Sequence, residues 1–67
     1  MSNVFIEDGL SIEIHYFESN LHNVMVYVTN KAKTYFVTPE NYHVQLLQVK
    51  CPYINEIEKA IIKFLAQ

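Results

Sequence analysis

The sequence predicts a small α+β domain, a four-stranded antiparallel meander followed by two helices packed on one face of the sheet, in the order ββββαα. Residues 1–37 consist of runs with a period of two, typical of strands with one apolar face, and contain a strong hairpin turn signal. Residues 38–66 change to a helical period, and a Cys-Pro step divides them into two helices. No repeat, low-complexity tract or Pro/Gly/Ser-rich linker interrupts the chain, so residues 1–67 are expected to form a single domain.

The first two strands are predicted on either side of an Asp8-Gly9 turn. Residues 4–6 are a short β-type run, and an Asp-Gly dipeptide favours the two-residue hairpin loop. Beyond the turn, residues 10–17 alternate between two faces, of which one is apolar and carries Leu10, Ile12, Ile14 and Tyr16. The other face carries Ser11, Glu13, His15 and Phe17.

Two more strands are predicted after turns at residues 18–20 and 30–33. The run 24–29 is rich in β-branched and aromatic residues, and residues 34–37 form the last strand. The run 24–29 has large apolar side chains on both faces, with Val24, Val26 and Val28 on one and Met25 and Tyr27 on the other. Whether Tyr35 or Phe36 joins Met25 depends on whether the preceding loop holds an even or odd number of residues, which the sequence leaves open.

Thr38-Pro39-Glu40 marks the predicted start of the first helix. A Thr side chain accepts one of the unpaired N–H groups, Pro at the first helical position lacks a donor that would go unused, and Glu is favourable near the positive end. Apolar residues then recur at helical spacing as Tyr42, Leu46 and Val49. Cys51-Pro52 ends this helix and opens a second one that runs to Leu65.

The second helix is the most clearly amphipathic element. One arc collects its apolar residues Ile54, Ile57, Ile61, Phe64 and Leu65, and the opposite arc collects Asn55, Glu56, Lys59 and Lys63. Glu58 is an anomaly, because it falls inside the apolar arc, between Ile62 and Leu65, and an unpaired buried carboxylate is costly. Two interpretations stay open. Either the arc is wide and Glu58 reaches solvent at its margin, or Glu58 and Ile62 flank a contact surface shared with another chain.

Length and composition predict that the core needs a supplement. A chain of 67 residues buries only about 60% of the surface that its unfolded form exposes, so its single core is marginally stable. One cysteine, Cys51, excludes an internal disulfide, and no paired Cys/His motif predicts a structural metal. Unusually good packing or self-association remains, and a hydrophobic content of 51% suits either, with self-association the simpler of the two.

The expected interaction surface follows from counting faces. Two helices cover one face of a small sheet, so the apolar side chains on the other face are left for a partner. We expect this surface to include Met25, Tyr27, Tyr35, Glu58 and Ile62. A symmetric homodimer is the commonest way to bury such a surface.

No catalytic residue, cofactor or metal ligand is predicted. Cys51 precedes a Pro at a helix start, a place that activates thiols, but a nucleophile also needs a positioned base, and His43 is the only histidine near it. We therefore interpret Cys51 as a small apolar residue at the turn between the helices. His15 and His22 stand alone, the acidic residues at positions 7, 8 and 13 are interpreted as solvated turn and edge residues, and a single glycine excludes a glycine-rich phosphate loop.

The segment Tyr35-Phe36-Val37-Thr38-Pro39-Glu40-Asn41-Tyr42, continued through Leu46-Leu47, resembles the KTSC domain, which is named for its occurrence at the C-terminus of some lysyl-tRNA synthetases. The resemblance covers residues 12–61 and extends to the order of the elements. The Tyr-x-Tyr of that family stands here as Tyr35-Phe36-Val37, and the small-residue and glycine step between its helices is replaced by Lys50-Cys51-Pro52-Tyr53. The resemblance implies the ββββαα topology and RNA binding, which has been suggested for such domains, and it assigns no functional residue.

Excess apolar surface without a catalytic set predicts a non-enzymatic protein-binding module of the inhibitor or adaptor type, which forms a homodimer and binds a larger protein. The small size also suits a virus-encoded protein that acts on a host enzyme. RNA binding is the second hypothesis, because aromatic side chains stack bases and Lys31 and Lys33 reach phosphate. Against it stand a net charge of −2 and the absence of Arg. The third is sequestration of a small nucleotide between subunits.

The location is expected to be cytoplasmic, without a membrane partner. Residues 1–7 lack a basic segment followed by a long apolar run. No stretch approaches the roughly 20 apolar residues that span a bilayer. A free cysteine agrees with a reducing compartment.

Overall fold

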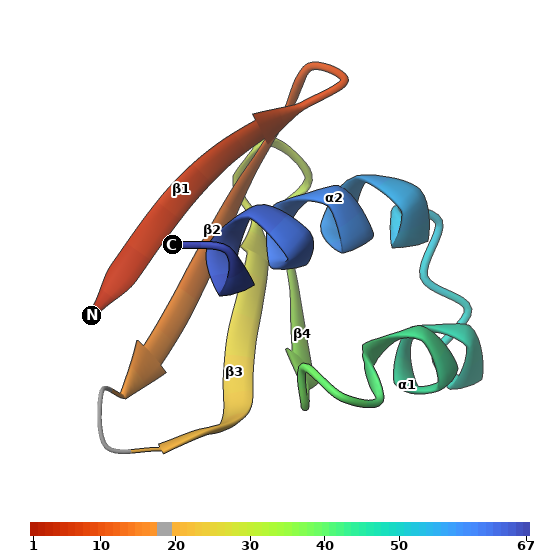
Figure 1. Ribbon diagram of the computed structural model, residues 1–67. Coiled ribbons are helices and arrows are strands. Elements are labelled where there is room, and N and C mark those ends of the chain that lie inside the picture. The colour runs from red at the N-terminus through yellow and green to blue at the C-terminus, as the bar shows by residue number, and fades with distance from the viewer. Residues whose placement is uncertain (18–19) are drawn as a thin grey trace.

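The computed structural model describes residues 1–17 and 20–67 and confirms the predicted ββββαα arrangement (Figure 1). One antiparallel sheet has the strand order β1-β2-β3-β4. Its strands are β1 (Ser2–Glu7), β2 (Leu10–Phe17), β3 (Asn20–Val28) and β4 (Lys33–Val37), with the short 3-10 helix η1 (Thr29–Lys31) before β4. The helices are α1 (Tyr42–Gln48) and α2 (Ile54–Leu65). The turn predicted at residues 18–20 falls on Glu18 and Ser19, which lie outside the described residues.

The predicted turn between β1 and β2 is confirmed. Asp8 and Gly9 both have positive φ, 50° and 81°, as a two-residue type I′ loop requires. Glu7 pairs with Leu10 directly across it, and the register then runs without interruption to Ser2 opposite His15. This register places Asn3, Phe5 and Glu7 on the same face as the apolar side chains of β2.

The loop between β3 and β4 is fastened to the first hairpin through Asn30. Its side-chain oxygen accepts the backbone N–H of Ser11 at 3.0 Å, and its side-chain nitrogen donates to the carbonyl of Gly9 at 2.9 Å. The Thr29 hydroxyl donates to the Ser11 carbonyl at 3.1 Å. Four residues, 29–32, therefore separate the paired Val28 and Lys33, which settles the register of β4.

This register decides the faces that the sequence leaves open. Tyr35 pairs with Val26 and Val37 pairs with Val24, so both lie on the valine face of the sheet. Phe36 pairs with Met25 and points to the opposite face.

Both helices cover the valine face, and α2 crosses in front of the sheet in Figure 1. The buried core joins the two layers and consists of Ile12, Ile14, Val24, Val26, Val28, Val37, Leu46, Cys51, Ile57, Ala60, Ile61 and Phe64. The Tyr16 and Phe64 rings pack against each other in a tilted arrangement, with centroids 4.8 Å apart and planes at 58°. Two residues that the sequence assigns to the apolar helix faces are exposed in the structure. Val49 is exposed because it caps the end of α1, and Leu65 because it lies in the last turn of α2.

The first helix begins later than predicted, at Tyr42 rather than Pro39. Residues 39–41 form a turn, in which the Asn41 N–H donates to the Thr38 carbonyl at 2.9 Å. The Thr38 hydroxyl donates to the side-chain oxygen of Gln45 at 3.3 Å, and the Thr38 backbone N–H donates to the same oxygen at 2.7 Å. Thr38 therefore closes the end of β4 onto α1 instead of capping the helix.

The end of α1 is a Schellman motif centred on Lys50. The Cys51 N–H donates to the Leu46 carbonyl and the Lys50 N–H to the Leu47 carbonyl, each at 3.0 Å. Lys50 takes a positive φ of 55°, the position at which glycine is usual. The chain turns at Cys51-Pro52, and α2 begins at Ile54 and ends at the predicted Leu65.

Two lysines tie α2 to the first hairpin. Lys63 Nζ lies 2.6 Å from Glu7 Oε2, and Lys59 Nζ lies 2.9 Å from Asp8 Oδ2. The two pairs differ in burial, because Glu7 is only 6% exposed whereas Asp8 and Lys59 are both exposed. Glu7 was interpreted as a solvated edge residue, and its burial under α2 corrects that prediction.

We predict that Lys63→Met destabilises the fold by about 1–3 kcal/mol, because it leaves the buried Glu7 carboxylate without its cation. Lys59→Met is the matched control and should change stability little, since exposed ion pairs contribute little. Urea unfolding followed by circular dichroism measures both variants. Equal effects of the two substitutions would contradict the distinction.

Candidate interaction face of the sheet

The face of the sheet that the helices leave uncovered carries a band of apolar side chains. We call it the open face, and it consists of Val4, Ile6, Glu13, His15, Met25, Tyr27, Thr34 and Phe36, together with Ser2, Ser11 and Asn23. The register sets these side chains in rows, because residues paired across antiparallel strands lie side by side. One row runs Ser2, His15, Met25, Phe36, and the next runs Val4, Glu13, Tyr27, Thr34.

Exposed apolar side chains lie on both outer strands of the open face. Phe36 on β4 is 76% exposed, and Ile6 and Val4 on β1 are 64% and 59% exposed. Met25 and Tyr27 on the inner strand β3 are half-buried by these neighbours. Large apolar groups exposed this far and gathered on one face are a common mark of contact surfaces.

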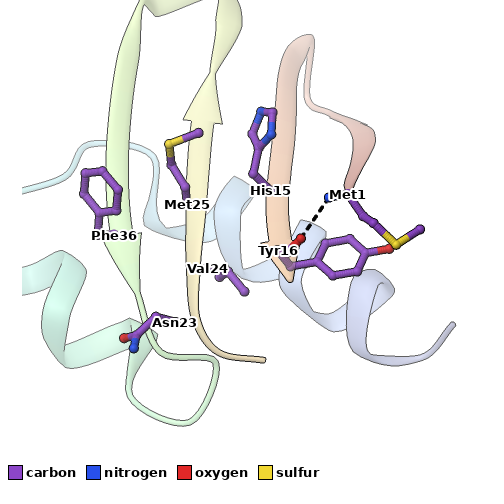
Figure 2. A pocket seen from close by; sticks show the side chains of 7 residues that line it. All are labelled: Met1, His15, Tyr16, Asn23, Val24, Met25 and Phe36. Carbon is purple, nitrogen blue, oxygen red and sulfur yellow. Dashed lines mark hydrogen bonds between the residues drawn. The ribbon is translucent and has the colours of Figure 1, made fainter. Parts of the chain in front are cut away.

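A hollow of about 410 Å³ opens at the end of this face where the β2–β3 register shifts between His15 and Phe17. Figure 2 shows the side chains of His15, Met25 and Phe36 side by side, each from a different strand. Met1 closes the other side, where its backbone nitrogen donates to the Tyr16 carbonyl at 2.9 Å. The lining is mostly apolar, so the hollow suits an apolar side chain of a partner.

Polar side chains also lie on the open face, among them Glu13, His15 and Asn23. His15 Nε2 lies 3.3 Å from Glu13 Oε2 on the neighbouring row, and Asn23 lies within β3. No group of three metal-ligating side chains occurs within residues 1–17 and 20–67. No helix in these ranges is both long enough and apolar enough to cross a membrane.

Cys51 lies on the other side of the molecule, buried in the core between the two helices. Its sulfur accepts the N–H of Tyr53 at 3.4 Å. The pKa of the Tyr35 hydroxyl is raised to about 12, mainly by burial and next by its hydrogen bond with Cys51. His43, the histidine that the sequence places closest, is exposed on α1, and its ring lies against Tyr42. The side chain of His22 lies outside the described residues.

The structure does not bring the five predicted surface residues together. Met25 and Tyr27 share the open face. Tyr35 lies on the valine face and packs against the core, and Glu58 lies between the two helices. Ile62 is 58% exposed on the side of α2 turned away from the sheet.

The Glu58 anomaly is explained by a contact between the helices. The Tyr42 hydroxyl of α1 donates to Glu58 Oε1 of α2 at 2.7 Å, so the carboxylate inside the apolar arc has a partner. The hydrogen bond to Glu58, together with burial, raises the pKa of Tyr42. Glu58 thus holds the two helices together, a role that neither interpretation of the sequence foresaw.

Sequence reasoning missed three residues of the open face, Val4, Ile6 and Phe36. Val4 and Ile6 were placed in a strand, and the period of two from Ile6 through the two-residue turn assigns them to the face of Ser11 and Glu13. Phe36 required the length of the loop before β4, which rests on the Asn30 contacts. The sequence therefore contains enough information to assign the side chains of β1 to a face of the sheet, but not those of β4.

Comparison with known proteins identifies no relative. No protein-family model matches the chain, and neither a curated protein nor a solved structure matches it.

We predict that Tyr42→Phe lowers stability by about 1 kcal/mol at pH 7, the usual contribution of a partly exposed hydrogen bond. A folded-state pKa above the unfolded value means that Tyr42 stabilises fully below the unfolded pKa, near pH 10, and that this contribution is lost as pH rises through the folded pKa. The deficit of Tyr42→Phe should therefore shrink at alkaline pH.

Urea titrations at neutral and alkaline pH measure this change. Glu58→Gln keeps an acceptor for the hydroxyl but removes the charge that opposes a phenolate, so its stability should fall less steeply with alkaline pH than that of the parent. A Tyr42→Phe deficit that stays constant across the pH range would contradict the assignment.

Proposed function

We propose that this chain is a non-enzymatic protein-binding module, and that the open face is its contact surface. The observation that carries the proposal is the placement of Val4, Ile6 and Phe36, which are more than half exposed on the same face as Met25 and Tyr27. Burying one such side chain contributes roughly 1.5–3 kcal/mol relative to leaving it in water. Several of them together give a substantial drive to associate.

A second copy of the chain is the partner that we favour. Two sheets stack face to face with their strands within about 30° of each other, and their inner side chains interdigitate. With the two-fold axis along the strands, β1 of one copy lies over β4 of the other, and the row that holds Met25 and Phe36 faces the same row of the partner copy. The apolar side chains of the two open faces then form a second core between the copies.

A larger protein is the other partner expected of an inhibitor or adaptor. The same apolar face supports this form of the proposal, because a surface that pairs with itself also fits a complementary apolar patch elsewhere. The hollow beside Met25 and Phe36 would take an anchoring side chain of that partner.

We predict that light scattering gives about twice the mass of one chain at micromolar concentration. Phe36→Lys and Ile6→Lys should shift the equilibrium toward monomer and lower the melting temperature, because dimerisation and folding are linked by mass action. Leu47→Lys is the matched control, since Leu47 is 55% exposed on α1, away from the open face.

Two outcomes would count against this assignment. Dissociation by Ile62→Lys with no effect of Phe36→Lys would move the interface to the outer side of α2. A monomer at every concentration, with Phe36→Lys as stable as the parent, would leave the open face without a role in self-association.

RNA binding remains the second candidate, and one observation favours it. Phe36 and Tyr27 present aromatic rings on an uncovered sheet, and Lys33 begins the same strand as Phe36. The net charge of −2 and the Glu13 carboxylate opposite Tyr27 oppose contact with phosphate.

We expect no tight complex with single- or double-stranded RNA at physiological salt in fluorescence anisotropy, because five Lys and no Arg release few counterions. Submicromolar, salt-sensitive binding that is abolished by Tyr27→Ala or Phe36→Ala would make RNA binding the leading function. Leu47→Ala is the control for a general loss of surface apolarity.

A further inference from the structure

Strand β4 is a free edge of the sheet, and its outward backbone groups can be identified. The Met1 and Tyr16 backbones exchange two hydrogen bonds of 2.9 Å, so Tyr16 faces β1. Hydrogen-bonded and non-bonded pairs alternate along antiparallel strands, so Glu13 and His15 face β3 and the valines of β3 face β4. Their partners Lys33, Tyr35 and Val37 therefore bond inward, and Thr34 and Phe36 direct N–H and C=O groups outward.

The next outward group along the chain supports this assignment. Thr38 has the same parity as Thr34 and Phe36, and its N–H donates away from the sheet to Gln45 on α1 at 2.7 Å. No hydrogen bond within residues 1–17 and 20–67 takes the corresponding groups of Thr34 and Phe36. Unpaired edge groups of this kind are the template onto which another strand adds.

A groove of about 640 Å³ runs beside this edge, between β4 and the end of α1. Its far wall is formed by α1 and the turn after it, where Leu46, Val49 and Pro52 lie beside Gln45 and Lys50. Val49, which caps the end of α1, is 60% exposed. An extended segment on β4 would turn every second side chain toward this wall, because side chains alternate along a strand.

The charge of the groove is of one sign. Lys33 and Lys50 lie in its lining, and no Asp or Glu does. Neither lysine forms an ion pair in the part of the chain that the structure describes, whereas Lys59 and Lys63 are paired with carboxylates of the first hairpin. A chain with net charge −2 thus presents a local positive site at this edge.

We propose that the groove between β4 and α1 binds an extended, acidic segment of a partner protein, which adds to β4 as a fifth strand. Main-chain hydrogen bonds to Thr34 and Phe36 hold the segment, an apolar side chain enters beside Val49 and Pro52, and flanking Asp or Glu residues meet Lys33 and Lys50. This site lies at the edge of the sheet and does not depend on association through the open face.

The test uses the whole chain as bait for a displayed library of random twelve-residue peptides. Enriched peptides should combine β-branched or other apolar residues with a net negative charge. Synthetic versions should bind the parent, and their affinity should fall at least about tenfold in Thr34→Pro, which removes an outward N–H at an edge position that tolerates proline. Thr34→Val retains the N–H and should bind like the parent.

The lysines are tested by Lys33→Glu and by Lys50→Gly. Each substitution should lower the affinity for the acidic peptides, and the loss of affinity should be larger at low salt than at high salt. Lys50→Gly suits the positive φ of that position, so reduced binding cannot be attributed to unfolding if its melting temperature equals or exceeds that of the parent.

Two results would overturn the proposal. One is enrichment of peptides without acidic residues, or of peptides that bind Thr34→Pro as well as the parent. The other is a groove that binds a single-stranded RNA probe through Lys33 and Lys50 with no effect of Thr34→Pro. Failure of dimerisation through the open face would leave these peptide results unchanged, so the two proposals fail separately.

Discussion

The packing of Ile57, Ala60, Ile61 and Phe64 of α2 against one face of the sheet fixes the rest of the molecule. Side chains alternate strictly along a strand, so burying Val24, Val26 and Val28 under the helices necessarily turns Met25 and Tyr27 to the opposite face. Two helices that total 19 residues, seven in α1 and twelve in α2, cannot cover both faces. The open face is therefore a direct consequence of how the core is filled.

Polar contacts fix the helices and the hairpins of the sheet relative to one another. The Glu7–Lys63 pair fixes α2 to the first hairpin, the Tyr42–Glu58 hydrogen bond fixes α1 to α2, and Asn30 fixes the two hairpin ends to each other. All three join segments far apart in sequence, and the first satisfies a buried carboxylate that would be costly to leave unpaired. Apolar side chains stay exposed on the open face and beside the β4 edge, and also on the outer sides of the helices, where Val44, Leu47 and Ile62 lie.

Elements whose signal is local were predictable from sequence, and those set by tertiary contacts were not. The Asp8-Gly9 turn and the end of α2 at Leu65 depend on neighbouring residues and were predicted correctly. The start of α1 was misplaced because Gln45 engages Thr38 from the next turn. The face of Tyr35 and the pairing of Glu58 required contacts across 9 and 16 positions, respectively, Tyr35 with Val26 and Glu58 with Tyr42, which a helical wheel or a strand pattern cannot contain.

The central claim, that the open face is a contact surface, is tested most directly by solvent exposure measured residue by residue in solution. A soluble paramagnetic agent broadens the NMR signals of exposed groups, and the measurement can be repeated over a range of protein concentrations. The account predicts that Val4, Ile6, Met25 and Phe36 gain protection together as concentration rises, while Val44 and Leu47, equally exposed on α1, do not. The account would be contradicted if the protection of Phe36 and Ile6 did not change with concentration, or if the protection of Val44 and Leu47 rose equally.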